Sequence, residues 1–123
     1  MNATQLAQNA YSSPAAPIKT ARGVELDAFS RITRRILETA TSKNHAGLVK
    51  ALHENRQLWT LLAVDVADQN NGLPEDLRAR IFYLAEFTQL HTSKVLAGTA
   101  SADALVDINR AIMSGLRNQG ATQ

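Results

Sequence analysis

The sequence predicts an all-α protein, a compact bundle of about four amphipathic helices behind a flexible N-terminal arm. The chain has 123 residues, which argues for a single domain able to bury a core of its own. Only 5% of its residues are aromatic, and alanine and leucine supply most of the apolar bulk, which favours helices over a β-sandwich. Apolar residues recur at steps of three and four in four separate segments, which is the helical period.

The segment before the first helix is small and polar, and it contains Pro14 and Pro17, which break regular elements. We therefore expect a flexible arm over residues 1–22, with at most a short helical turn near Tyr11. The helical domain is expected over residues 23–117. Residues 118–123 are expected to be a frayed tail.

The first predicted helix covers about residues 24–41, and Asn44 or Ser42 can cap the second, which covers about residues 45–68. The second helix carries a seam at alternating steps of four and three, which keeps one face against a neighbouring helix. Its members are Leu48, Leu52, Asn55, Trp59, Leu62 and Val66. From Leu58 to Val66 the helix is apolar on nearly every side, which predicts either a central place in the bundle or an interface shared with a partner.

The third predicted helix follows a turn at residues 69–74 and extends to about residue 97. Pro74 suits its first position, because the missing N–H has no partner to lose there. Gly98 is a candidate for the residue after its end. Ser101 can cap the fourth helix, whose apolar stripe is Leu105, Ile108, Ile112 and Leu116. The short connections favour antiparallel neighbours.

Several functions are excluded by composition. Without cysteine the chain has no disulfide, thiolate metal site or cysteine nucleophile. Three histidines leave little material for a histidine metal site. No apolar stretch approaches the ~18–20 residues of a membrane helix, and the N-terminus lacks the pattern of a secretory signal. We expect a cytoplasmic protein that does not insert into a membrane.

A search for chemistry finds no glycine-rich phosphate loop, no paired histidines and no nucleophile motif. We therefore expect no enzyme activity, no metal and no cofactor. Asp65 and Asp68 lie one turn apart at a helix end and are interpreted as solvated. His91 falls on an apolar seam, where we expect a hydrogen-bonded core residue.

Basic residues give little support for nucleic-acid binding. The formal net charge is +2, and the basic excess in residues 1–61 is interpreted as solvated surface. Arg31, Arg34 and Arg35 cluster on the first helix, but a nucleic-acid site usually brings a denser patch with interleaved aromatics. Nucleic acid is therefore not an expected partner.

Asn55 and the third helix are more informative. Asn55 sits in an apolar seam, and an unpaired buried amide costs ~1–3 kcal/mol. It is either a satisfied core amide that fixes helix register or an interface residue. Tyr83, Phe87 and Leu90 lie to one side of the third helix's seam and Phe82 to the other. This flank either packs within the bundle or forms an exposed binding surface.

Several blocks of residues together resemble the FlaF family, the flagellar biosynthesis regulators of alphaproteobacteria. They are Asn-Ala-Tyr at 9–11, Ala-Leu-His-Glu-Asn-Arg-Gln-Leu-Trp at 51–59, Leu-Pro-Glu-Asp-Leu-Arg-Ala-Arg-Ile at 73–81 and Leu-Val-Asp-Ile-Asn-Arg-Ala-Ile-Met-Ser-Gly-Leu at 105–116. The likeness spans residues 9–116. The turn reads Asn-Asn-Gly-Leu-Pro where Gly-Asn-Ala-Leu-Pro is typical, and the third helix lacks a tryptophan near 87. If that flank contacts the partner, the second departure implies a partner preference of this chain's own.

The resemblance implies a non-enzymatic regulator of flagellum biogenesis that affects flagellin production and export together with a second regulator, FlbT. The expected mechanism is direct binding of flagellin as a secretion chaperone. A bundle with a spare groove can mask the amphipathic helical ends of unassembled flagellin. The expected walls of that groove are the second helix and the aromatic flank of the third. The alternative is post-transcriptional control of flagellin synthesis with FlbT, through flagellin messenger RNA.

Nine residues are candidates for contact with a partner, either because they match the family or because they lie on an apolar flank. Arg110 is expected to pair with a carboxylate on a neighbouring helix or chain. As an alternative, the matched polar residues simply support the fold. The candidates are Tyr11, Asn55, Trp59, Asp65, Tyr83, Phe87, Leu90, Asn109 and Arg110.

Overall fold

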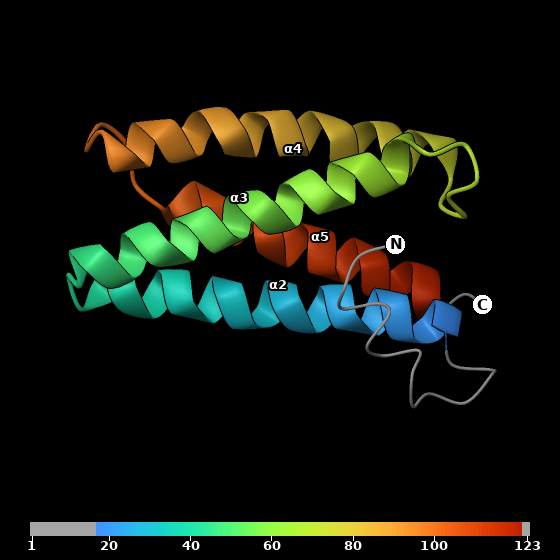
Figure 1. Cartoon of the computed structure of the whole chain (residues 1–123), viewed down its shortest axis with the longest axis horizontal. Helices are drawn as coiled ribbons and strands as arrows, with labels where there is room; N and C mark the ends of the chain where they lie inside the picture. Colours follow the sequence, from blue (N-terminus) through green and yellow to red (C-terminus); the bar gives the residue numbers. More distant parts are fainter. Residues whose placement is uncertain (1–16, 122–123) are drawn as a thin grey trace.

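Four helices follow one another along the chain and alternate in direction (Figure 1). They are α2 (Pro17–Thr41), α3 (His45–Ala67), α4 (Glu75–Leu96) and α5 (Asp103–Ala121). This computed structural model describes residues 17–121, and the side chains of residues 26–118. Within that range no strand occurs, so the predicted all-α bundle is confirmed.

The first helix begins earlier than its apolar periodicity predicts. Helix α2 starts at Pro17, so residues 17–22 belong to it and not to the arm. The prediction treated this proline as a breaker, but a proline fits the first turn of a helix because its missing N–H has no partner there. Residues 1–16, including Tyr11, lie outside the described residues, so the arm stays a prediction. Helix α5 likewise continues past residue 117, to Ala121.

The turn between α2 and α3 is closed by backbone hydrogen bonds. Lys43 adopts a left-handed conformation with φ 57°. Its N–H bonds to the Ala40 carbonyl oxygen at 3.3 Å, and the Asn44 N–H bonds to that of Thr39 at 2.9 Å. This is the Schellman pattern of a helix end. The Asn44 side chain then accepts a bond of 3.0 Å from the Gly47 N–H, which confirms Asn44 as the cap of α3.

The residues predicted to mark the ends of α4 and the start of α5 do so, except that Pro74 precedes α4 and is not its first residue. Pro74 is the cap of α4, one residue before the predicted place, and its carbonyl oxygen accepts the first helical bond from the Arg78 N–H at 3.0 Å. Gly98 follows α4 with φ 79°, as predicted. The Ser101 hydroxyl accepts a bond of 3.0 Å from the N–H of Asp103, the first residue of α5.

Helix α3 is central in the bundle. It packs along α2 on one side and along α4 on the other, while α5 packs mainly on α2 and approaches α4 at few positions (Figure 1). A central place was one of the two explanations for the apolar stretch at residues 58–66. Because α2 and α4 flank α3, one long side of α3 is left facing outward.

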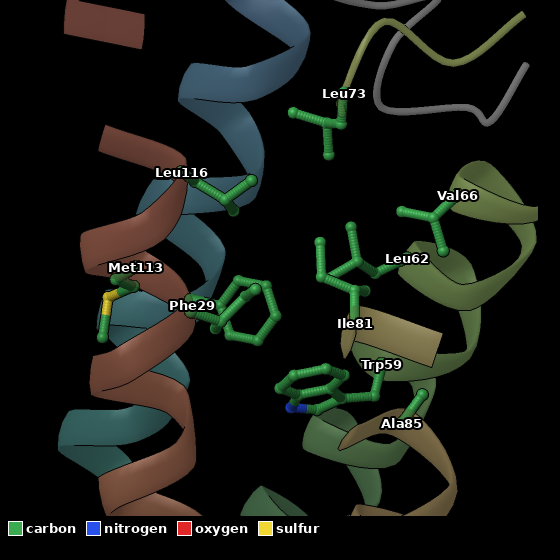
Figure 2. Close-up of a cluster of buried hydrophobic side chains, with 10 residues drawn as sticks. Phe29, Trp59, Leu62, Val66, Leu73, Ile81, Ala85, Met113 and Leu116 are labelled. Atoms are coloured by element: carbon green, nitrogen blue, oxygen red, sulfur yellow. The ribbon is translucent and has the colours of Figure 1, made fainter. Parts of the chain in front are cut away.

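The core has two clusters of buried side chains. In the first, the rings of Phe29 and Trp59 meet edge to face with centroids 5.4 Å apart. Figure 2 shows Met113 and Leu116 of α5 on one side of this cluster and Leu62 of α3 on the other. The second cluster lies nearer the α2–α3 turn and consists of Ile32, Ile36, Ala51, Leu52, Ala102, Leu105 and Val106.

Candidate functional site

A groove runs between α3 and α4. Four residues from each helix line it, spaced i, i+3, i+4 and i+7, so one face of each helix forms a wall. The lining residues are Thr60, Ala63, Val64 and Ala67 of α3, and Phe82, Ala85, Glu86 and Gln89 of α4. Three of these are alanines, whose short side chains leave the space between the helices open. The groove holds about 290 Å³.

Two arginines join α3 to α4 at the two ends of this groove. At one end, Arg56 Nη2 donates to the carbonyl oxygen of Gln89 at 2.8 Å. At the other, Arg78 donates through Nε to the carbonyl oxygen of Val66 at 2.8 Å and through Nη2 to that of Asp68 at 3.0 Å. The second arginine thereby satisfies carbonyl groups at the end of α3 that have no helical partner. Both hold the two walls at a fixed spacing.

The rim of the groove is apolar and exposed. Val64 is 67% exposed and Phe82 is 45% exposed, and Leu61 stands exposed beside them on the outer side of α3. Glu86 is the single charged residue of the lining. Exposed apolar surface that forms a contiguous patch is typical of an interaction site.

The aromatic flank of α4 lies on a different side of that helix. Tyr83, Phe87 and Leu90 are 67%, 36% and 69% exposed, so the described part of the chain leaves this flank largely uncovered. Phe87 stacks on the ring of His91 with centroids 5.3 Å apart. The structure therefore does not pack this flank inside the bundle. Helix α4 carries apolar surface both on this flank and, through Phe82, in the groove.

Asn55, Trp59 and Asn109 meet in the core. Trp59 Nε1 donates to Asn109 Oδ1 at 2.8 Å, and Asn109 Nδ2 donates to Asn55 Oδ1 at 2.8 Å and to Thr33 Oγ1 at 3.0 Å. The three candidate residues are 0% exposed. A partner docked on the surface of this structure does not touch them. Their burial agrees with the core alternative, but Asn55 is not the fully satisfied amide predicted, because only its Oδ1 has a hydrogen-bond partner in the described residues.

Three buried polar atoms are left without a hydrogen bond in the described residues: Asn55 Nδ2, Arg56 Nε and the Thr88 hydroxyl oxygen. The side chains of Asn55 and Thr88 are fully buried. A buried polar group without a partner costs ~1–3 kcal/mol. The centre of the bundle is therefore less stable than its apolar packing alone would make it.

The remaining candidates are at the surface. Asp65 is exposed, and its carboxylate accepts a bond of 3.2 Å from Asn71 Nδ2 in the turn after α3. Arg110 is exposed on α5. Across residues 26–118 the structure forms one ion pair, between Arg35 and Glu54, so the carboxylate expected for Arg110 is not found on a neighbouring helix. A carboxylate on another chain stays a prediction.

His91 is half-buried, and its Nε2 lies 2.9 Å from the Ser101 carbonyl oxygen. The hydrogen bond is as predicted, but His91 is not the core residue that its place on the seam predicts, because its side chain is only half-buried.

Comparison with known families gives a match to the one described as Flagellar protein FlaF, over residues 7–116. This covers nearly the whole chain. The chain belongs to the FlaF family. The blocks that resemble FlaF proteins all lie inside the matched range, so that resemblance is confirmed. No curated protein and no solved structure gives a match.

Neither a metal site nor a membrane span is found in the described part of this FlaF protein. It brings together no group of three or more histidine, aspartate or glutamate side chains that could hold a metal ion. None of its four helices is long and apolar enough to cross a membrane.

The site residues predicted from the sequence of this FlaF chain do not include most of the residues that line the groove. Ala63, Val64, Ala67 and Glu86 were not candidates, and Phe82 was noted only as lying beside the seam. A usable signal was present, because Val64 falls outside the seam of α3 and Phe82 outside that of α4. The sequence alone does not show that the face of α3 with Val64 lies next to the face of α4 with Phe82.

Proposed function

We propose that this FlaF protein binds flagellin as a secretion chaperone and thereby controls flagellin production and export. Membership of the FlaF family supports a flagellar role. The observation that carries the proposal is the apolar groove between α3 and α4, with Val64 and Phe82 on its rim. A groove between two helices is the usual receptor for an amphipathic helix.

The amount of exposed apolar surface supports a protein partner. On the aromatic flank, Tyr83 and Phe87 leave about 200 Å² of aromatic surface in water, taking ~200 Å² for each ring, and Phe82 leaves about 90 Å² at the groove. Leu90 adds to the flank, and Leu61 and Val64 add to the surface beside Phe82. Apolar surface that gathers in patches of this kind is often functional. Three aromatic residues on one helix are also the residue type that interfaces favour.

Masking is the physical advantage of such a site. The helical ends of unassembled flagellin carry an apolar face that the filament later buries. A chaperone that covers this face prevents premature polymerisation and keeps flagellin available for export. A preformed groove suits this role, because it adds no ordering cost of its own on binding.

The alternative, action with FlbT on flagellin messenger RNA, has less support. Arg35 of the arginine cluster is already paired with Glu54, which leaves Arg31 and Arg34 exposed on that helix. Two arginines are a small electrostatic footprint for RNA, and the exposed aromatics lie on α4 and not beside them. Binding to RNA would weaken steeply with added salt.

Size-exclusion chromatography of the chain mixed with flagellin monomer tests the proposal. We expect co-elution at concentrations on the order of tens of micromolar. Val64→Asp places a charge on the rim and should abolish co-elution, whereas Val49→Asp, on the same helix but outside the groove, should not. Separate elution of flagellin and the unaltered chain would contradict direct chaperoning.

A further inference from the structure

The groove between α3 and α4 has a definite capacity. It holds about 290 Å³, and an apolar cavity of ~150 Å³ accommodates a benzene-sized group. There is therefore room for about two side chains of benzene size. The α3 wall spans residues 60–67, which is about 10 Å at ~1.5 Å per residue. Two side chains one turn apart on a partner helix fit that length.

Within the described part of the chain, the polar side chains that line the groove form hydrogen bonds, except for that of Glu86. The Thr60 hydroxyl donates to the Arg56 carbonyl oxygen at 2.9 Å. The Gln89 amide donates to that carbonyl oxygen and to Thr60 Oγ1, both at 3.3 Å. Glu86 forms no ion pair among the residues that the structure describes. Its exposed carboxylate thus stands on an apolar rim without a cation.

We propose that the groove takes an amphipathic helix that inserts large apolar side chains, one turn apart, between Val64 and Phe82, and that sets a lysine or arginine beside Glu86. A cation is favoured because a carboxylate bordered by apolar surface interacts more strongly than one in open water. This inference rests on the proposed function, in which flagellin supplies the helix.

The same charge argues against two other occupants. An acidic helix would set its carboxylates against Glu86. A second copy of the chain, docked through the same face, would bring the two Glu86 side chains to one interface, because a twofold interface uses the same patch on both copies. The lining offers no cation in return.

Four variants of the full chain test the assignment, with flagellin affinity as the readout. Glu86→Lys should weaken binding about tenfold at low salt and Glu86→Gln about threefold, with both effects shrinking as salt screens the pair. Ala67→Leu should fill the groove and abolish binding. Glu38→Lys, a charge reversal at an exposed site on α2, is the matched control and should leave affinity unchanged.

Two synthetic helical peptides separate this inference from the proposed function. Each carries two leucines one turn apart, followed one turn later by lysine in one peptide and glutamate in the other. We expect the lysine peptide to compete with flagellin and the glutamate peptide to fail.

If flagellin binds Glu86→Lys and Ala67→Leu as tightly as the unaltered chain, the groove assignment is wrong while chaperoning stands. If flagellin does not bind but the lysine peptide does, chaperoning is wrong and the groove chemistry stands. Equal binding of the two peptides would overturn the role of Glu86, and a dimer that Ala67→Leu dissociates would make a second copy the occupant.

Discussion

Trp59 and Asn109 join two helices that lie diagonally across the bundle. The indole Nε1 of Trp59 on α3 donates to the amide oxygen of Asn109 on α5 at 2.8 Å, although the backbones of α3 and α5 do not pack directly on each other. Asn109 also bonds to Thr33 on α2. A single side chain therefore ties together three of the four helices, and it is fully buried.

Asn109→Ala should lower the free energy of unfolding by about 3–4 kcal/mol. The substitution leaves the Trp59 N–H and the Asn55 oxygen unpaired, and each buried unpaired group costs ~1–3 kcal/mol. Urea denaturation measures the change. Asp107→Ala, exposed two residues earlier on the same helix, should stay within ~0.5 kcal/mol of the unaltered chain. If Asn109→Ala lowered the free energy of unfolding by less than about 1 kcal/mol, the buried hydrogen-bond network would contribute little to stability.

Replacing Trp59 separates a core role from partner contact. Because the side chain is fully buried against Phe29, Trp59→Ala should lower stability by ~3–5 kcal/mol. Trp59→Phe keeps much of the apolar volume and should remain folded at room temperature. We expect this variant to bind flagellin as the unaltered chain does, as measured by co-elution. A folded Trp59→Phe protein that has lost flagellin would restore Trp59 as a contact residue.

Thr88→Val should raise stability by about 1 kcal/mol. It removes a buried hydroxyl that has no hydrogen-bond partner and keeps a β-branched side chain of similar shape. Thr92→Val is the matched control, because the Thr92 hydroxyl donates to the Thr88 carbonyl oxygen at 2.7 Å. Thermal melts should show a higher melting temperature for the first variant and no gain for the second. Equal shifts would show that the Thr88 hydroxyl is satisfied in solution.

The sequence predicts the helices of this bundle well because each has a local signal. Asn44 and Gly98 mark helix ends through their own backbone and side-chain chemistry, and both act as expected. Pro17 misleads because a proline can either break a helix or begin one, and local sequence does not distinguish the two. For the site, the sequence predicts that a polar residue of the apolar seam such as Asn55 is either buried in the core or part of an interface with a partner. The groove itself depends on which sides of α3 and α4 adjoin, and that is decided by tertiary packing.

Arg78→Ala should weaken both the fold and the groove. The guanidinium donates to two carbonyl oxygens at the end of α3, and hydrogen bonds from charged groups contribute ~1.5–3 kcal/mol each before solvent exposure reduces them. We expect a loss of about 1–2 kcal/mol in urea denaturation and weaker flagellin binding under conditions where the variant is folded. Arg80→Ala, exposed on the same helix, removes the same charge outside the groove and should change neither. Unchanged flagellin affinity for Arg78→Ala would show that the arginine does not hold the groove open.

Gly115 and Gly98 should respond oppositely to the same substitution. A methyl group at either position meets no atom within 4 Å, so sterics with neighbouring residues do not separate them. Gly115 lies inside α5, where alanine is favoured over glycine by ~0.5–1 kcal/mol, so Gly115→Ala should stabilise the chain by that amount. Gly98 has φ 79°, a left-handed conformation that costs a residue with a Cβ ~1–2 kcal/mol, so Gly98→Ala should destabilise it. Paired thermal melts measure both signs. If Gly115→Ala leaves stability higher but lowers flagellin affinity, the open space at Gly115 belongs to an interface with the partner.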